Sequence, residues 1–367
     1  TDAFAADGSF TTAVRRNWRL YAPLAAGAVV GVFAAFQVLA SSASAGFQMP
    51  GIQWYEYAFT QARVLLSYVT LFVLPVGLTP DHDVVLSRSL LDGGAGLAIL
   101  LWVALVAVAV SLRRKYPVAV LGFLVFLVLL MPTSSVIPIK DLMAERRMYL
   151  PFVGLLLVAL DWLSRVSVPN GTLAGISTCA LAVFAVGTYH RAEAWGDSEK
   201  LWESAIAATP MKARPYGNLA SVYLVQRQCA AALRVFDRAK EAKVKIEDAT
   251  VLATWALSLE CGGDLDAGIA KMQAAVETEP SAQAFASLGR MYLRAQRLTD
   301  AERALAEGER LNPAWETTHV YRAMLHTARN NEQQAIAELK RVLARNPANR
   351  HARELLEQTS ERSRAYP

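Results

Sequence analysis

The segment 132–151, PTSSVIPIKDLMAERRMYLP, concentrates charge between two long apolar runs. Five of the eight residues from 140 to 147 are ionisable: Lys140, Asp141, Glu145, Arg146 and Arg147. Charged groups at a bilayer surface are costly to desolvate and often mark a site for a charged ligand. Two adjacent guanidinium groups suit phosphate, because each offers a planar fork of N–H donors. The segment predicts either a phosphate site or a short loop whose arginines anchor the next membrane helix.

In the phosphate-site interpretation each charged side chain has an expected role. Arg146 and Arg147 grip the phosphate, and Lys140 adds attraction. Asp141 or Glu145 holds the arginines in place, because a carboxylate pairs well with a guanidinium. A phosphate at a membrane surface is what a lipid-linked sugar presents.

A second polar loop, LTPDHDVV, contains Asp81, His82 and Asp83. Two carboxylates around a histidine suit a divalent cation or an acid–base pair, and they equally suit a solvated turn after a proline. If a lipid-linked sugar binds between the two loops, Tyr149 is expected to stack on the sugar. Otherwise Tyr149 serves as an aromatic anchor at the membrane interface.

Composition divides the chain into two parts. The net charge of the 367 residues is +5, without the stripe of Lys and Arg that nucleic-acid binding needs, so we expect no nucleic-acid partner. Residues 1–190 hold nearly all the uncharged apolar runs, whereas residues 191–360 are charged and rich in alanine. We therefore expect an all-α protein with a polytopic helical membrane domain at 1–190 and a water-facing domain at 191–360.

Five apolar runs are predicted to cross a bilayer, for which about 20 residues suffice. They are Leu20–Ala40, Gly94–Leu112, Tyr116–Ile139, Met148–Leu163 and Val166–Tyr189. Short cytoplasmic loops are enriched in basic residues, so the basic cluster at 113–115 is placed inside. By parity, both polar loops and everything after residue 189 lie outside.

The stretch Phe59–Leu78 is also apolar, but parity leaves no room for a sixth span. Arg63 near its start and Pro75 near its end leave a short amphipathic core. We expect an interfacial helix on the outer surface, with a re-entrant helix or a true span as the alternatives.

A period of about 34 residues runs through the second half from residue 213. Small residues recur at the eighth and twentieth positions of each unit, and a proline often ends the second helix. The small residues are Ala220, Ala232, Ala256, Gly289, Ala301, Ala323 and Ala335. This pattern is typical of tetratricopeptide repeats, helix pairs that stack into an α-solenoid. We expect four repeats after a half unit at 202–210, with His326 standing where an aromatic residue is usual.

The repeats also carry candidate binding and cross-linking residues. Asn218 and Arg290 are expected to line a groove for an acceptor peptide, and a docking scaffold without a specific groove is the alternative. Cys229 and Cys261 fall at the turns of neighbouring repeats. In an oxidising compartment they would form a disulfide, provided that their Cα separation permits one.

Three runs resemble the C-terminal part of the transmembrane and tetratricopeptide repeat family. They are WYEYAFTQARVLLSYVTLFVLPVGLTPDHD at 54–83, SSVIPIKDLMAERRMYLP at 134–151 and WGDSEKLWESAIAATP at 195–210. Members of this family resemble protein O-mannosyltransferases of the GT-C type, in bacteria as well as animals. The resemblance covers most of the chain, and the run at 134–151 is its most specific part.

The resemblance implies a GT-C-like membrane domain and a glycosyltransferase. Such an enzyme moves a sugar from a polyprenyl-phosphate donor to a hydroxyl of a protein, here on the periplasmic side of a bacterial inner membrane. The implied partners are the lipid bilayer, the lipid-linked sugar and a protein acceptor engaged by repeats in the periplasm; a divalent metal stays open.

One departure from the GT-C pattern concerns the catalytic carboxylate, which lies in the first extracytoplasmic loop of such enzymes. The corresponding loop, 41–58, contains Glu56 but no acidic pair. We expect the catalytic carboxylate to lie upstream of Thr1, because five spans are also too few for the family. Two alternatives stay open: a non-catalytic, membrane-anchored repeat scaffold for cell-envelope assembly, and a polymerase or ligase that acts on polysaccharide.

Overall fold

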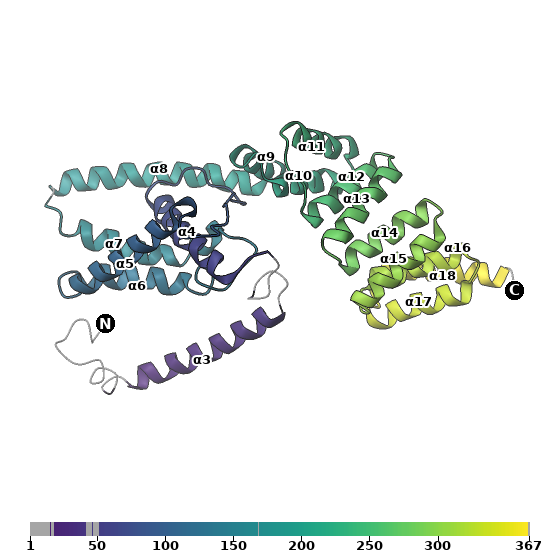
Figure 1. Ribbon diagram of the computed structural model, residues 1–367, viewed down its shortest axis with the longest axis horizontal. Coiled ribbons are helices and arrows are strands. Elements are labelled where there is room, and N and C mark those ends of the chain that lie inside the picture. Colours follow the sequence, from purple (N-terminus) through teal and green to yellow (C-terminus); the bar gives the residue numbers. More distant parts are fainter. Residues whose placement is uncertain (1–14, 16–17, 42–45, 47–50, 168, 366–367) are drawn as a thin grey trace. The chain divides into compact units, whose positions relative to one another are not determined.

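The computed structural model describes residues 15, 18–41, 46, 51–167 and 169–365. The chain divides into two compact units, Thr1–His190 and Arg191–Pro367 (Figure 1). The described part of the chain is helical and contains no β-strand. The helices of unit 1 are α3 (Trp18–Ser41), α4 (Trp54–Val73), α5 (Ala95–Leu112), α6 (Pro117–Leu130) and α7 (Pro151–Leu163), with 3₁₀ turns η1 (Asp92–Gly94) and η2 (Glu145–Met148). Helix α8 (Asn170–Gly196) crosses the boundary between the units.

Helices α6 and α7 form a close hairpin that depends on two glycines. A Cβ atom on Gly122 would collide with the backbone carbonyl of Gly154, and the reverse substitution would collide in the same way. Small residues let apolar helices approach this closely in a membrane, where packing rather than hydrophobic burial holds helices together. Phe126 and Leu130 of α6 pack beside this contact in the core of unit 1, against Val64 of α4.

Replacing Gly154 by valine is therefore expected to force α6 and α7 apart and to lower the stability of unit 1 by about 1–3 kcal/mol. Gly175→Val is a matched control, because a Cβ at Gly175 of α8 meets no atom within 4 Å. Thermal unfolding of the two purified variants in one detergent measures the difference. Equal melting temperatures would contradict the proposed packing role of Gly154.

Two of the predicted spans are shorter than the sequence indicated. Helix α6 ends at Leu130, not Ile139, and has 14 residues; α7 begins at Pro151 and has 13. At 1.5 Å per residue these helices are about 20 Å long, against about 30 Å for the hydrocarbon core of a bilayer. The apolar run continues past Leu130, but Pro132 and Pro138 interrupt it and the backbone folds back into a loop.

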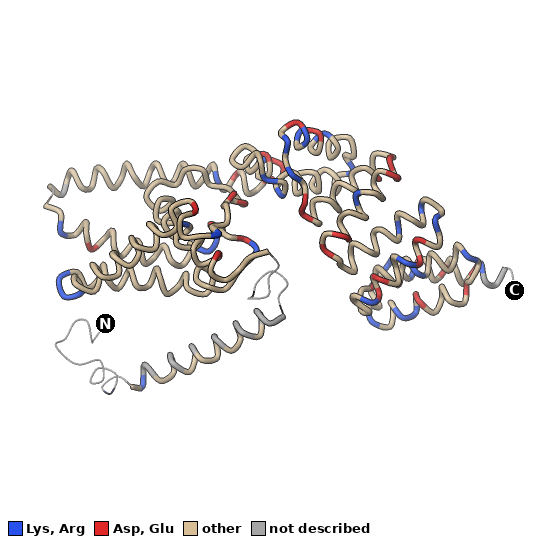
Figure 2. Tube along the Cα trace, in the orientation of Figure 1, with Lys and Arg blue, Asp and Glu red and all other residues tan. Residues whose placement is uncertain are grey.

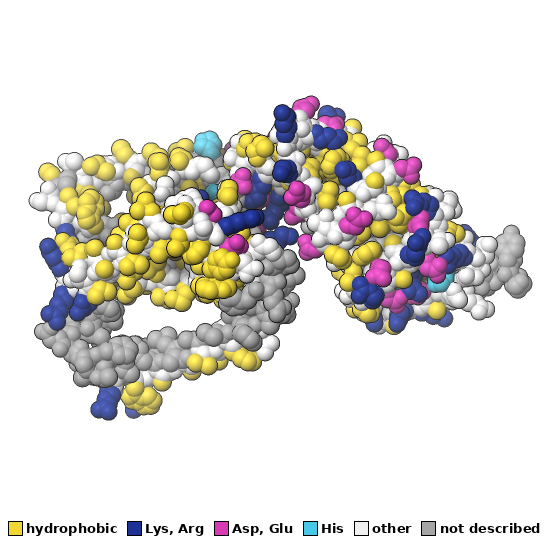
Figure 3. Space-filling model, viewed as in Figure 1, with side chains coloured by type: hydrophobic (Ala, Val, Ile, Leu, Met, Phe, Trp, Pro, Cys, Tyr) yellow, Lys and Arg dark blue, Asp and Glu magenta, His cyan; other side chains and the backbone are white. Residues whose placement is uncertain are grey.

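Two segments of the described chain are long and apolar enough to cross a membrane. Asp92–Leu112 has a mean hydropathy of 2.6 and Gly171–Gly196 one of 1.6. Little of the first and none of the second is buried within the protein. Figure 2 shows few charges along the helices of unit 1, and Figure 3 shows apolar side chains over their surface. By length and composition, these two segments are candidate membrane spans.

The one acidic residue inside a predicted span has a structural role. Asp161 of α7 accepts a hydrogen bond from the backbone N–H of Ala119, in the first turn of α6, at 3.3 Å. The same carboxylate pairs with Arg165 at 3.0 Å, and Arg165 lies over the ring of Tyr116. A carboxylate is stabilised at the positive N-terminal end of a helix dipole. This end of the hairpin also carries the basic residues 113–115, opposite the loop at 131–150.

Unit 2 consists of paired helices of similar length. After α9 (Ser198–Ala208) the pairs are α10 (Ala213–Val225) with α11 (Cys229–Glu241), α12 (Ala249–Cys261) with α13 (Leu265–Thr278), α14 (Ala282–Arg294) with α15 (Leu298–Leu311), and α16 (Glu316–Ala328) with α17 (Glu332–Arg345). Each pair packs together and against the next pair. A further helix, α18 (Arg350–Ala365), packs on α17 and was not predicted.

The small residues of the 34-residue period lie where helices cross. Ala220, Ala256 and Ala323 are fully buried or nearly so. A Cβ at Gly289 would lie 2.6 Å from the side chain of Leu305 in the paired helix. The helix pairs, and the small residues buried where those helices cross, therefore confirm the predicted tetratricopeptide repeat fold of the second half.

Candidate functional site

Helix α4 holds the charged 140–147 loop in place through polar side chains. The hydroxyl of Tyr57 donates to the carbonyl of Thr133 at 2.6 Å, and the amide of Gln61 donates to the carbonyl of Leu142 at 2.8 Å. Tyr57 and Gln61 are fully buried or nearly so. Helix α4 therefore packs into unit 1 along one face. The helix begins at Trp54, not at Phe59 as predicted.

A second tyrosine of α4 contacts the loop closer to its charges. The hydroxyl of Tyr68 accepts from the backbone N–H of Ala144 at 3.0 Å and donates to the carbonyl of the same residue at 3.1 Å. Burial raises the pKa of Tyr57 to about 12 and raises that of Tyr68, and the nearby guanidinium of Arg147 opposes both increases. Both phenols therefore keep their protons at neutral pH and remain hydrogen-bond donors.

Asp141 organises the two predicted phosphate ligands. Its carboxylate accepts from Arg146 at 3.0 Å, and its backbone carbonyl accepts from Nη2 of Arg147 at 2.7 Å. The Arg146 side chain is 71% exposed, whereas Nη1 of Arg147 is buried and has no hydrogen-bond partner among the described residues. Lys140 and Tyr149 are exposed on the same loop.

Glu145 connects this loop to the second polar loop. One carboxylate oxygen accepts from the backbone N–H of Thr79 at 2.6 Å and lies 2.9 Å from Nε2 of His82. The second loop is also tied to α4, because Arg63 donates to the hydroxyl of Ser87 at 2.8 Å. The structure thus brings together the two loops that the sequence analysis singled out separately.

The acidic residues of the second loop lie in different environments. Asp81 is buried and Asp83 is exposed, while His82 faces Glu145. Among the residues that the structure describes, no group of three or more His, Cys, Asp or Glu side chains is placed to hold a metal ion. This surface therefore combines the adjacent Arg146 and Arg147 with the hydrogen-bonded pair of His82 and Glu145.

Sequence reasoning missed Tyr57, Gln61 and Tyr68. Gln61 and Tyr68 lie within Phe59–Leu78, the stretch predicted to be an interfacial helix, and Tyr57 lies two residues before it. They recur after four and then seven residues, the spacing of one helix face, and this periodicity was the available signal. Their partners are backbone carbonyls and amides of a distant loop, which no side-chain pattern reveals.

Glu145→Ala is expected to release the second loop. The substitution removes a charged acceptor from two hydrogen bonds, each worth about 1.5–3 kcal/mol. Backbone amides in 79–82 should then exchange with solvent at least about tenfold faster, measured by hydrogen-exchange mass spectrometry. Glu193→Ala is the control, because it removes an exposed carboxylate that pairs with Lys200 at 3.2 Å. Unchanged exchange in 79–82 would show that other contacts hold this loop.

The predicted peptide-binding residues of the repeats have different surroundings. Asn218 lies half-buried on α10. Arg290 forms two 2.6 Å hydrogen bonds with Glu260 of the preceding repeat, whose side chain is 5% exposed. Arg294 donates to the same carboxylate at 2.6 Å and keeps half of its side chain exposed. Arg290 therefore joins two repeats, and Arg294 is the more accessible cation beside it.

A disulfide joins the first two repeats. It links Cys229, the first residue of α11, to Cys261, the last residue of α12, with a Cα–Cα distance of 5.4 Å. This distance is within the usual range for disulfides. Glu260 directly precedes the second cysteine, so the covalent link and the arginine pair constrain the same end of α12.

No protein-family model matches this chain, and no curated protein matches it. Among solved structures, it is similar to YrrB, described as a TPR protein with an unusual peptide-binding site, with 18% identity over 48% of this chain and 87% of that one and a TM-score of 0.37. It is similar to TTC0263, a thermophilic TPR protein of Thermus thermophilus, with 16% identity over 50% of this chain and 95% of that one and a TM-score of 0.38.

A third similar structure is PilF of Pseudomonas aeruginosa, with 16% identity over 52% of this chain and 90% of that one and a TM-score of 0.37. The repeat assignment rests on the helix pairs and packing positions of unit 2. The resemblance of the first half to GT-C-type glycosyltransferases stays a prediction from its motifs.

Proposed function

We propose that this chain is part of a membrane glycosyltransferase that binds a polyprenyl-phosphate sugar between the 79–87 and 140–147 loops and passes the sugar to a protein hydroxyl. The observation that carries the proposal is the Arg147 guanidinium: Nη2 is held by the Asp141 carbonyl, and the buried Nη1 meets no acceptor with hydrogen-bond geometry among the described residues, beside the phenols of Tyr57 and Tyr68. A buried donor on a cation is costly to leave unpaired, and a phosphate oxygen would satisfy it.

The surroundings of Arg147 suit a phosphate diester. Arg146 is held by Asp141 but remains mostly exposed, so it can offer its remaining N–H groups to the same anion. The neighbouring phenols of Tyr57 and Tyr68 stay protonated and add no negative charge. Tyr149 is 84% exposed on the same loop and is available to contact the sugar or the lipid interface.

Two features support a membrane location with the repeats outside the cytoplasm. The apolar, exposed helices α5 and α8 favour a bilayer around unit 1. The disulfide of unit 2 favours an oxidising compartment, because cytosolic thiols are kept reduced. In a bacterium this combination corresponds to the inner membrane, with the repeats in the periplasm.

In this proposal the repeats engage the acceptor protein. Stacked helix pairs present an extended surface for a peptide, and Asn218 and Arg294 offer polar contacts on it. The catalytic carboxylate is supplied from outside the loops described above, so the arginines bind the donor and do not themselves transfer protons.

Saturable binding of polyprenyl-phosphate mannose to the full chain in lipid nanodiscs tests the proposal. Replacing Arg146 and Arg147 by alanine should weaken binding at least about tenfold, since each charge-assisted hydrogen bond is worth about 1.5–3 kcal/mol. Arg113→Ala/Arg114→Ala is the matched control, because it removes an adjacent, exposed arginine pair at the other end of the α6–α7 hairpin. The polyprenol without phosphate should not compete.

Two outcomes would overturn the proposal. Binding that the double variant and the control reduce equally would make the arginine loop a membrane anchor. No saturable binding, together with capture of envelope proteins that depends on unit 2, would instead favour a membrane-anchored repeat scaffold.

A further inference from the structure

The fourth repeat carries polar residues at positions that are apolar in the third. Phe285, Leu288 and Tyr292 of α14 are followed 34 residues later by His319, Arg322 and His326 of α16. In the third repeat Leu288 and Tyr292 belong to the buried core, and Phe285 packs against it. The packing of α16 against its neighbours therefore depends on charge and hydrogen bonding where the third repeat uses apolar contact.

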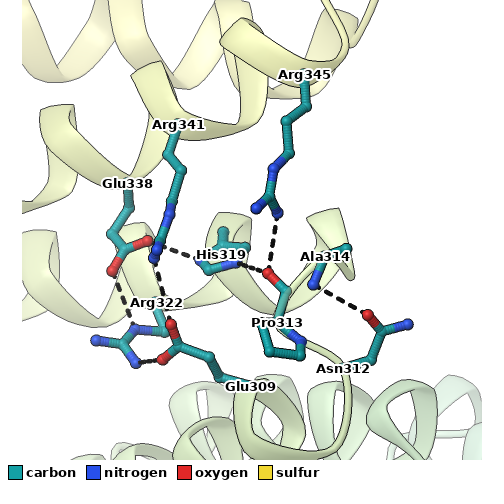
Figure 4. Close-up of polar contacts among 9 residues, drawn as sticks. All are labelled: Glu309, Asn312, Pro313, Ala314, His319, Arg322, Glu338, Arg341 and Arg345. Atoms are coloured by element: carbon teal, nitrogen blue, oxygen red, sulfur yellow. Dashed lines mark hydrogen bonds and ion pairs between the residues drawn. The ribbon is translucent and has the colours of Figure 1, made fainter.

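His319 is a buried histidine with two acceptors (Figure 4). Its side chain is 2% exposed; Nδ1 lies 2.8 Å from the carboxylate of Glu338, and Nε2 lies 3.0 Å from the carbonyl of Pro313. A backbone carbonyl can only accept, and an ionised carboxylate can only accept. Both contacts are satisfied together only when both ring nitrogens carry protons, so this geometry fits the imidazolium form.

The charges around His319 connect three helices. On α17, Glu338 also pairs with Arg322 at 3.2 Å, and Arg341 reaches Glu309 of α15 at 3.3 Å. Arg322 pairs with Glu309 as well (Figure 4). From α17, Arg345 donates to the Pro313 carbonyl at 2.9 Å.

Charges from neighbouring helices also act on α16. The charge of Arg290 on α14 acts on Tyr321 of α16. Hydrogen bonding to Glu338 raises the pKa of His319, with the Pro313 carbonyl acting in the same direction.

His326 lies two turns further along α16 in the opposite situation. Its Nδ1 is buried and has no hydrogen-bond partner among the described residues. Burial lowers the pKa of His326, as do the charges of Arg322 and Arg329; Glu338 and Glu302 oppose the decrease. This environment fits the neutral imidazole. A groove of about 550 Å³, lined by Arg322, His326, Glu338 and Arg341 among others, lies at this end of the repeat.

We propose that these two histidines make the fourth repeat a pH-sensitive element, packed most tightly near pH 6.5 and loosened on both sides of that value. The alkaline side belongs to His319. A histidine with a raised folded-state pKa contributes all of its stabilisation below its ordinary value of about 6.5 and loses it as pH rises through the raised value. The acidic side belongs to His326, whose stabilisation is complete above about 6.5 and is lost as pH falls through its lowered value.

The element lies in α16 and α17, two repeats further along unit 2 than the disulfide-linked pair of repeats. A change there would alter the groove and its charge without disturbing the disulfide-linked first repeats. The proposal is independent of any glycosyltransferase activity, because it concerns only contacts within unit 2.

Hydrogen-exchange mass spectrometry of the full chain in detergent micelles, from pH 5 to pH 8.5, tests the proposal. After correction for intrinsic exchange, the opening equilibrium of α16 and α17 should be smallest near pH 6.5 and should rise by roughly three- to tenfold toward each end. The amides of α12 and α13 serve as the internal reference and should show no such profile.

Variants separate the two sides of the profile. His319→Gln cannot titrate and should remove the alkaline rise while keeping the acidic one; Glu338→Gln should also remove the alkaline rise by taking away the charged acceptor. His326→Tyr, which restores the residue type of the third repeat, should remove only the acidic rise. A flat profile in the wild type, or the same two-sided profile in all three variants, would overturn the proposal.

Discussion

Glu260→Ala is expected to lower the free energy of unfolding around α12 and α14 by about 3 kcal/mol, the loss typical for one partner of a buried ion pair. The carboxylate accepts three hydrogen bonds of 2.6 Å from Arg290 and Arg294, and its side chain is only 5% exposed. Removing it leaves Arg290, which is largely buried, without its counter-charge. Hydrogen exchange of the α12 and α14 amides in the full chain measures the change.

Glu203→Ala is the control that tests how far burial decides the strength of such an ion pair. Glu203 and Arg238 form the same two-bond geometry, at 2.6 and 2.9 Å, but both side chains are more than a third exposed. Exposed ion pairs contribute about 1 kcal/mol or less, so this variant should change stability far less. Equal losses in the two variants would mean that burial does not decide the strength of the Glu260 contacts.

Cys229→Ser/Cys261→Ser is expected to destabilise the first two repeats by about 3.5 kcal/mol, because the disulfide closes a long loop in the unfolded chain. The two cysteines are separated by 32 residues. Urea unfolding of the full chain, with and without a reductant, measures the effect. Reductant should destabilise the wild type about as much as the double substitution does, and should not change the double variant further.

Cys179→Ser is the matched control for the disulfide. Cys179 is a free, exposed cysteine of α8 and has no bond to lose. If reductant lowered the stability of the wild type and of Cys229→Ser/Cys261→Ser equally, the stabilisation would not come from this disulfide. The same experiment bears on location, since a protein that needs the bond must mature in an oxidising compartment.

The repeat half was predictable because its signals are local. Small residues at Ala220, Gly289 and Ala323 mark helix crossings within one helix pair, and neighbouring pairs repeat the same contact. The same repeat register placed Cys229 and Cys261 at the turns of neighbouring repeats, so a disulfide between them was one of the predicted alternatives. The ion pairs of Glu260 with Arg290 and Arg294 were missed, because they depend on which face of α14 meets α12 and not on a pattern within either helix.

The first half was predicted less accurately, because apolar composition does not define where a helix ends. The run Tyr116–Ile139 is uncharged throughout, yet the helix stops at Leu130. The residues after it are held by Tyr57, whose hydroxyl bonds the carbonyl of Thr133, 76 residues away in sequence. This long-range hydrogen bond stands where a continuing helix would make a local one. The hydropathy of the sequence does not reveal it.

The amino-acid sequence by itself determined the all-α class, the repeat register and the identity of the charged loops, since these depend on residue types at short spacings. Only the tertiary structure decided that Asp141 serves both arginines, that Glu145 faces His82, and that α4 supports both loops. Each of these contacts joins segments whose separation in space is set by packing of the whole unit. Directional hydrogen bonds then select one partner among several chemically equivalent ones, and that selection requires the positions of all of them.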